Sequence, residues 1–187
     1  MNQNYKVLEQ CLWEASDFSY DDPKTAQKHQ FSVKGYLSCE YDSTIYNETN
    51  GSIQSQIFPK IKEWDRPEAG TFEYCNKRIC NSKHHIILAA YVDNENAGYL
   101  IGYEKNCSFY CWVVAVEEKY RRMKILTRMM DIFENRAKQL GYSEITLKTL
   151  NNKREMLSYL VKNKWNFVEI IKKKNITQNE IIVEKKI

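Results

Sequence analysis

The residues best suited to metal binding or nucleophilic chemistry are six cysteines and three histidines in a chain of 187 residues. Cys75 and Cys80 precede the pair His84-His85, but this spacing fits no common zinc pattern. The polar start of the chain, MNQNYKVLEQ, lacks the apolar segment of a secretory signal. We therefore expect a cytoplasmic protein with reduced thiols, no disulfide framework and no metal site.

Charge is divided unevenly along the chain. Residues 1–75 contain 7 Lys/Arg and 12 Asp/Glu, a net charge of −5, whereas residues 76–187 contain 21 and 12, a net charge of +9. A basic half of this size often meets an anion such as a nucleotide cofactor, nucleic acid or a membrane surface, and a solvated Lys-rich surface explains it equally well. The densest basic patch is Lys172-Lys173-Lys174. No nucleic-acid-binding motif accompanies it, so we do not expect nucleic acid as the partner.

The elements that must position these residues can be identified from residue 84 onward. Apolar runs rich in β-branched residues predict three strands, at 85–92, 97–104 and 108–116. Turn-forming segments at 93–96 and 105–106 separate them, which predicts an antiparallel meander. The third run, SFYCWVVAV, is apolar on both faces, and we expect it at the centre of the sheet.

A change of hydrophobic period then predicts the most clearly marked helix of the chain. Its apolar residues recur at helical spacing, and Gly141 follows where a C-terminal cap belongs. The apolar residues are Leu126, Met129, Met130, Phe133, Ala137 and Leu140. Further on, the pattern predicts a strand at 143–150, a helix at 153–164, and strands at 166–171 and 180–184. The apolar residues expected on one face of this second helix are Met156, Leu157, Leu160 and Val161.

The first 83 residues are less regular. We expect helices at Tyr5–Ala15 and at Ser52–Trp64, the latter broken near Pro59, and a strand at Phe31–Cys39. The composition, 43% hydrophobic and 28% charged, is that of a globular protein. The longest apolar run, 112–116, is far shorter than the roughly 20 residues that span a bilayer. No repeat or linker divides the sequence, so we expect one domain and no membrane anchor.

The order strand, strand, strand, helix, strand, helix, strand, strand over residues 84–187 resembles the core of the GNAT (GCN5-related N-acetyltransferase) family. The segment VEEKYRRMKIL, 116–126, resembles the loop by which that family passes from a central strand into a long helix. The segment NNKREMLSYLVKNKW, 151–165, resembles the family's last helix and its exit. The resemblance implies an α+β domain with a mostly antiparallel twisted sheet of six to seven strands flanked by helices. It also implies an acetyl-CoA-binding core at 84–187, with the divergent residues 1–83 shaping the acceptor side of the same domain.

In this family the loop holds the pyrophosphate of acetyl-CoA. A helix start suits that role because its unpaired N–H groups and partial positive charge attract an anion, and neighbouring arginines add charge-assisted bonds. The residues that the resemblance assigns to the cosubstrate are Val114, Val116, Arg121, Arg122, Met123, Lys124, Ile125, Leu126, Thr127 and Asn152. The chain departs from the family at positions that normally hold small residues. These positions hold Lys124, which could itself contact a phosphate, Leu126, which fits the core stripe of the helix, and Lys164 at the exit of the last helix.

The resemblance also implies direct attack of an amine on the thioester, which requires an acid for the departing thiolate and a base for the amine. Leu160 occupies the position at which many members of the family carry the acidic tyrosine. The adjacent Tyr159 lies about 100° further around the helix, so it serves as the acid only if the helix is rotated or shifted in register. The carboxylates nearest in sequence for the base are Glu104 and Glu117.

The function implied is N-acetyl transfer from acetyl-CoA to a primary amine of a small molecule or a protein. This function is compatible with a homo-oligomeric enzyme. The acidic, tyrosine-rich first half suits a cationic amine. Because direct transfer needs no nucleophile, Cys107 and Cys111 are expected to pack rather than react. The alternative is a catalytically inactive binding or regulatory protein of the same fold, which the substitutions at Lys124, Leu126 and Leu160 motivate. A nucleic-acid binder is the third interpretation.

Overall fold

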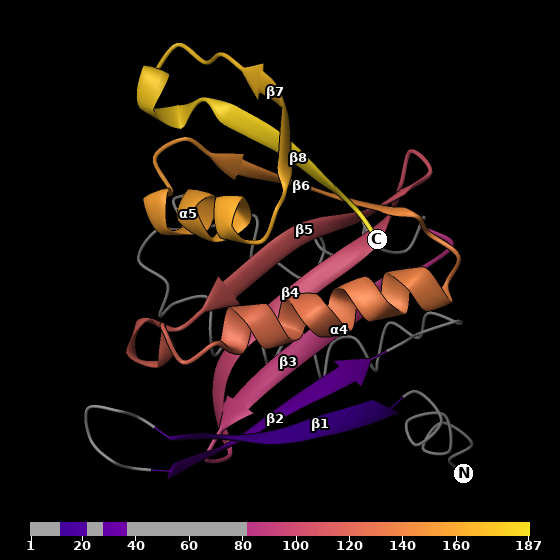
Figure 1. Cartoon of the computed structure of the whole chain (residues 1–187), viewed down its shortest axis with the longest axis vertical. Coiled ribbons are helices and arrows are strands. Elements are labelled where there is room, and N and C mark those ends of the chain that lie inside the picture. Colours follow the sequence, from indigo (N-terminus) through magenta and orange to yellow (C-terminus); the bar gives the residue numbers. More distant parts are fainter. Residues whose placement is uncertain (1–11, 22–27, 37–81) are drawn as a thin grey trace, which may run out of the picture.

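Eight strands form one sheet in the structure, a computed structural model that describes residues 12–21, 28–36 and 82–187. The strands are β1 (Leu12–Asp21), β2 (Lys28–Tyr36), β3 (His85–Val92), β4 (Glu95–Lys105), β5 (Ser108–Val116), β6 (Glu144–Leu150), β7 (Asn166–Ile171) and β8 (Glu180–Lys186). Their order across the sheet is β1-β2-β3-β4-β5-β6-β8-β7, and every pair is antiparallel except β5 with β6. Figure 1 shows the sheet with its helices. The predicted α+β fold with a mostly antiparallel sheet is confirmed, and the sheet has one strand more than the upper expectation.

The predicted meander of three strands is confirmed, and its two hairpins have the same kind of turn. Asp93 and Asn94 join β3 to β4 with φ angles of 48° and 68°, and Asn106 and Cys107 join β4 to β5 with φ angles of 50° and 64°. Two left-handed residues in a two-residue loop are the mark of a type I′ turn, whose twist matches that of the flanking strands. The meander therefore follows from local sequence.

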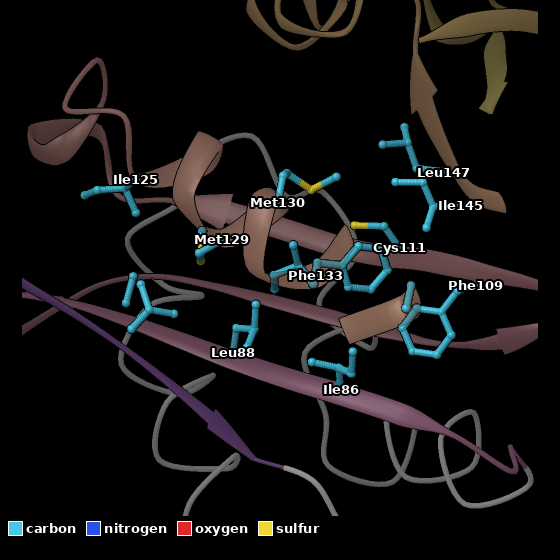
Figure 2. Close-up of a cluster of buried hydrophobic side chains, with 14 of the residues drawn as sticks. Ile86, Leu88, Phe109, Cys111, Ile125, Met129, Met130, Phe133, Ile145 and Leu147 are labelled. Carbon is cyan, nitrogen blue, oxygen red and sulfur yellow. The ribbon is translucent and has the colours of Figure 1, made fainter. Parts of the chain in front are cut away.

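Helix α4 (Ile125–Gln139) lies across one face of the sheet and packs into the main core. Figure 2 shows its buried side chains against those of β3, β5 and β6. The residues labelled there are Ile86, Leu88, Phe109, Cys111, Ile125, Met129, Met130, Phe133, Ile145 and Leu147. Gly141, with φ of 88°, follows the C-cap residue Leu140, and its N–H donates to the carbonyl of Lys138 at 2.9 Å. The predicted helix and its glycine cap are confirmed.

The close approach of α4 to the sheet depends on Gly102 of β4. A Cβ atom at this position would overlap the ring of Phe133 and would come within 3.0 Å of the carbonyl oxygen of Tyr110. The register between β4 and β5 also shifts at this point, so that Trp112 is the extra residue of a bulge in β5. A side chain larger than hydrogen at residue 102 would therefore push the helix outward.

Helix α5 (Arg154–Lys162) ends in a left-handed residue that is not glycine. Lys164 has φ of 60°; its N–H donates to the carbonyl of Val161, and the N–H of Trp165 donates to the carbonyl of Leu160. This is the Schellman pattern, and both Leu160 and Trp165 are buried in the core. The predicted buried face is wrong at Val161, which is 63% exposed. The helix packs against the core through Met156, Leu157 and Leu160, whereas Val161 lies on the last turn, on the side exposed to solvent.

Of the secondary-structure predictions for the first 83 residues, one is confirmed and one is wrong. The helix expected at Tyr5–Ala15 is wrong over its described part, because β1 begins at Leu12 and pairs with β2. The strand expected at Phe31–Cys39 is confirmed as β2, which begins three residues earlier. The helix expected at Ser52–Trp64 lies outside the described residues. In the described part of the chain, no helix is both long and apolar enough to cross a membrane.

Candidate active site

The central feature of the site is an opening in the sheet between β5 and β6. The two parallel strands are paired only from Phe109 opposite Ile145 to Cys111 opposite Leu147. Beyond these pairs β5 continues to Val116 and β6 continues to Leu150. Figure 1 shows the strands diverging toward the end at which α5 lies. The strands therefore form a V whose apex is at Cys111 and Leu147.

The diverging part of β5 presents backbone groups to this opening. The N–H of Glu117 donates to the carbonyl of Ala97 on β4 at 2.8 Å, and the β4–β5 register is continuous from Val116 back to Val113. Backbone groups alternate in direction along a strand, so those of Val114 and Val116 point away from β4. They point to the side on which β6 has left the ladder. The sequence-predicted residues Val114 and Val116 therefore face the opening through their main chain.

The strand leads into a loop that ends at the start of α4. After the short helix η3 (Glu118–Tyr120), Arg122 and Lys124 have φ angles of 70° and 62°. Lys124 is the N-cap residue, its side chain makes no capping bond, and the first turn holds no acidic residue. The first bond of the helix is from the N–H of Arg128 to the carbonyl of Lys124. The preceding N–H groups, of residues 125–127, make up a helix start that can accept an anion.

The side chains of the loop fix its position at the end of the sheet. The Nε of Arg121 donates to the carbonyl of Val116 at 3.2 Å. Lys119 and the hydroxyl of Tyr120 both donate to Glu95 at the start of β4, each at 2.6 Å. The hydrogen bond to Glu95 raises the pKa of Lys119, so this ammonium stays charged. Sequence reasoning missed Glu95, because no local pattern links it to residues 24 and 25 positions further along the chain.

The predicted cofactor residues divide into backbone and side-chain groups. Ile125 is buried, and Met123 and Leu126 are partly buried against the core, so these three can offer only their main chain. Arg122 is exposed and lies 3.9 Å from Glu155 of α5, a pair that crosses from the loop to the far side of the opening. Asn152 lies on that far side, two residues after the end of β6. The structure thus places the predicted residues on the two sides of one opening.

Tyr159 lies at the first turns of α4. Thr127, Asp131 and Glu134 of α4 and Cys111 of β5 all contribute to the electrostatic environment of its hydroxyl. Burial, together with these acidic neighbours, raises the pKa of Tyr159, so the hydroxyl keeps its proton at neutral pH. Leu160 is fully buried in the core. The structure therefore brings Tyr159, and not residue 160, toward the apex of the opening.

The two candidate carboxylates lie at opposite ends of the β4–β5 pair. Glu117 follows β5 directly at the loop end, and one of its carboxylate oxygens is buried. Glu104 lies near the far hairpin, where its carboxylate is 3.8 Å from the Nδ1 of His84. That His84 nitrogen is also 2.8 Å from the hydroxyl of Tyr142. The structure does not bring Glu104 to the loop.

The two described cysteines differ in environment. Burial raises the pKa of Cys111 to about 12, which leaves a neutral thiol packed in the core. Cys107 is exposed in the hairpin turn between β4 and β5. Among the described residues no three His, Cys, Asp or Glu side chains are arranged to hold a metal ion.

Comparisons with known proteins show which family and which solved structures this chain resembles. The model of the acetyltransferase (GNAT) family matches residues 50–160. No curated protein sequence matches the chain. Among solved structures, a candidate streptothricin acetyltransferase from Bacillus anthracis, in complex with acetyl coenzyme A, is 20% identical with a TM-score of 0.53. The match covers 57% of this chain and 65% of that protein, which is just under two thirds of its length.

Two further structures match over more of their length. The ribosomal-protein-S18-alanine N-acetyltransferase of Escherichia coli is 11% identical with a TM-score of 0.63, over 82% of this chain and 94% of that one. A Bacillus subtilis acetyltransferase in complex with CoA is 14% identical with a TM-score of 0.57, over 83% of this chain and 99% of that one. At these identities the likeness is one of fold. Because the family model covers more than half of the sequence, including β5, the loop and α4, the chain belongs to the GNAT family of acetyltransferases.

Proposed function

We propose that this protein is an N-acetyltransferase that moves an acetyl group from acetyl-CoA to a primary amine by direct attack in a ternary complex. The observation that carries the proposal is the V between β5 and β6, open beyond Cys111 and Leu147 and leading to a helix start without a side-chain cap. A strand edge can bind an extended amide-containing arm, and a helix start can bind a pyrophosphate. The order of these two features along the chain matches the order of the two parts of CoA.

The cosubstrate would be held mainly by the backbone. The amides of its arm would pair with the main chain of Val114 and Val116, and its pyrophosphate would accept from the N–H groups of Ile125–Thr127. Arg122 and Lys124, both exposed at the loop, would add positive charge. Asn152 would contact the arm from the other side of the V. Substitution of the family's small residues leaves the backbone part of this site in place.

In the reaction, the amine nitrogen attacks the thioester carbonyl carbon, the new C–N bond forms, and the C–S bond breaks. The hydroxyl of Tyr159 would give its proton to the departing thiolate and regain one from solvent. The stretch of β5 beyond the apex, residues 112–116, carries no carboxylate, and neither Glu104 nor Glu117 projects from it. We therefore propose that the amine loses its proton to water.

The first test is calorimetric titration with acetyl-CoA and, separately, with CoA. We expect a dissociation constant of micromolar order, which is about −8 kcal/mol, and weaker binding by Lys124→Ala and Arg122→Gln. Lys138→Ala is the matched control, because Lys138 is an exposed lysine in the last turn of the same helix. Absence of heat and of thermal stabilisation at millimolar ligand, or equal loss of binding in the control, would refute this site.

A second candidate function is a binding protein that holds acetyl-CoA without transferring the acetyl group. The full burial of Leu160 favours it, since no acid can reach the opening from that position. The two functions differ in one assay, thiol release from acetyl-CoA in the presence of lysine, polyamine or aminoglycoside acceptors. Binding with release that depends on the amine supports the enzyme, and binding without release for any amine supports the binding protein.

A further inference from the structure

The V between β5 and β6 has two faces, and the core and the proposed cosubstrate occupy one of them. On the face that α4 and α5 cover, the apex residues Cys111 and Leu147 belong to the main core. The cosubstrate would lie on this face too, because its pyrophosphate would bind at the start of α4. The acceptor amine therefore reaches the thioester from the opposite face of the sheet.

On the β6 side, the residue that borders the opening on this opposite face is Lys148. It is the first residue of β6 beyond the last β5–β6 pair, which ends at Leu147. Ile145 and Leu147 are buried in the core, so the alternation of side chains along a strand turns Thr146 and Lys148 to the other face. A lysine thus stands where β6 leaves β5.

On the β5 side, the border on the same face is aromatic. Gly102 of β4 faces the ring of Phe133 on α4, so the next residue, Tyr103, points to the opposite face. Trp112, the first residue of β5 beyond the apex, packs its ring against that of Tyr103, with 6.2 Å between the ring centroids. Because residues 112–116 carry no charged side chain, this side offers no carboxylate to neutralise Lys148.

Lys148 belongs to a cluster in which two lysines share one carboxylate. Glu180 begins β8, and its two oxygens lie 3.1 Å from the Nζ of Lys148 and 3.2 Å from the Nζ of Lys173. The Glu180 side chain is 10% exposed, whereas the two lysines are 41% and 43% exposed. Burial alone would raise the pKa of Glu180, but the two ammonium groups hold it below its usual value. The carboxylate is therefore ionised, and the cluster keeps a net positive charge.

The cluster has donors left for a further anion. Each ammonium carries three N–H donors, and its contact with Glu180 uses one of them. The carboxylate also fixes both ammonium groups in place, so that a ligand pays less to order them. Glu184, the next acidic residue along β8, lies opposite Thr146, beside the closed part of the V. An anion at the open end of the V would therefore meet positive charge.

We propose that the acceptor is a primary amine that carries an anionic group of its own, such as a carboxylate. Lys148 and Lys173 bind this group while the amine enters the V beside Trp112. The inference rests on the proposed acetyl transfer and narrows its class of acceptor. It differs from the cationic acceptor that the composition of residues 1–75 favours, so experiment can separate the two expectations.

The test compares ω-amino acids of increasing chain length with their own amides, in the assay of thiol release from acetyl-CoA. Each pair differs by one negative charge, and the series spans a range of distances between amine and anion. At the length that fits best, we expect kcat/KM of the acid to be about tenfold above that of its amide, mainly through KM. The advantage should shrink as salt is added, because both lysines are partly exposed.

Four variants, each assayed below its melting temperature, assign the preference to the cluster. Lys148→Gln should remove most of the preference for the acid, and Lys148→Arg should keep it. Glu180→Gln releases both lysines and should not weaken the preference, which separates anion binding from a structural role of the ion pairs. Lys186→Gln is the matched control, because Lys186 pairs with Glu144 across the same two strands at their other end.

The outcomes distinguish this inference from the function on which it rests. Equal rates for acid and amide at every length, or faster acetylation of polyamines than of every ω-amino acid, overturn the inference and leave acetyl transfer in place. An equal loss of preference in Lys148→Gln and Lys186→Gln overturns it as well. Absence of thiol release with every amine overturns the proposed acetyl transfer and this inference together.

Discussion

Lys124 occupies a backbone conformation that costs the fold free energy, and this makes it the most informative residue to replace. Its φ of 62° and ψ of 12° lie in the left-handed region, which costs a residue with a Cβ roughly 1–2 kcal/mol. Glycine avoids that cost but loses more chain entropy on folding, by roughly 0.5–1 kcal/mol. A positive charge at a helix start is a further small cost of a few tenths of a kcal/mol. The net gain expected for Lys124→Gly is therefore about 1 kcal/mol.

The perturbation needs two variants, because lysine and glycine differ in both strain and charge. Lys124→Ala removes the charge and keeps the Cβ, whereas Lys124→Gly removes both. We expect the melting temperature to rise from lysine to alanine to glycine, with a total gain of roughly 2–4 °C at about 1 kcal/mol. Thermal unfolding without ligand measures the strain separately from any effect of binding.

Cofactor affinity should move in the opposite direction. If Lys124 contacts a phosphate, both variants lose the same charge-assisted contact, and the dissociation constant of CoA should rise about tenfold in each, or about 1.4 kcal/mol. The loss should shrink as salt is added, because Lys124 is exposed and its charge is screened beyond about 8 Å at physiological ionic strength. Calorimetric titration at two salt concentrations measures this.

Two results would refute the reasoning, each at a different point. Equal melting temperatures for the alanine and glycine variants would show that the left-handed backbone costs nothing at this position. Tighter CoA binding by the glycine variant would show that the lysine obstructs the loop, and would favour the binding or regulatory protein that has altered its cofactor site.

Three further outcomes follow from burial and packing. Burial, and to a lesser extent neighbouring His84, lowers the pKa of His85 from 6.5 to about 4. Between these two pH values the unfolded chain binds the proton and the folded chain does not. The free energy of unfolding should therefore be at its full value above pH 6.5 and should fall by up to about 3 kcal/mol as the pH drops to 4. His85→Phe should weaken this pH dependence of the free energy of unfolding, measured by urea unfolding at a series of pH values. The same pH dependence in the variant and the wild type would contradict the prediction. Gly102→Ala should lower the free energy of unfolding by about 1–3 kcal/mol, since the ring of Phe133 must move; an unchanged urea midpoint would count against this packing. Tyr159→Phe should lower kcat about ten- to a hundredfold without changing the Kd of acetyl-CoA, and because the pKa of Tyr159 is raised, wild-type activity should not decline through its ionisation below pH 10.

The parts of the fold that sequence alone could predict are those with a local cause. The meander follows from apolar runs and from two-residue turns of Asp, Asn and Cys, and α4 follows from a helical stripe that ends at Gly141. β1 was missed because its sequence, LWEASDFSYD, lacks a clean alternation of apolar and polar residues, and because it is recognised as a strand only through its pairing with β2. Strand pairing of that kind is decided by register and not by propensity.

Sequence alone could nominate residues for the candidate site, but it could not give the geometry in which the structure arranges them. Val114, Val116 and the loop residues could be assigned by resemblance, yet the opening itself depends on where the pairing of β5 and β6 ends, at Cys111 and Leu147. No local pattern reports that position. Glu95 and Glu155 hold the loop from elsewhere in the chain, and such contacts are likewise invisible until the sheet is assembled.

The absence of glycine from the loop argues against the proposed cofactor site, but the left-handed backbone conformation that glycine favours is present in the loop. Lys124 and Lys164 stand where the family has small residues, and both keep the left-handed backbone. At Lys164 two main-chain bonds and the burial of Leu160 and Trp165 enforce the conformation; at Lys124 the chain must turn so that Ile125 enters the core. Packing of these neighbours exceeds the roughly 1–2 kcal/mol that each left-handed lysine costs. A glycine at this position lowers the free-energy cost of the turn, whereas an anion site requires only that the turn is formed. In this chain the turn is formed, and the N–H groups that follow Lys124 lie at the start of the helix as they would after a glycine.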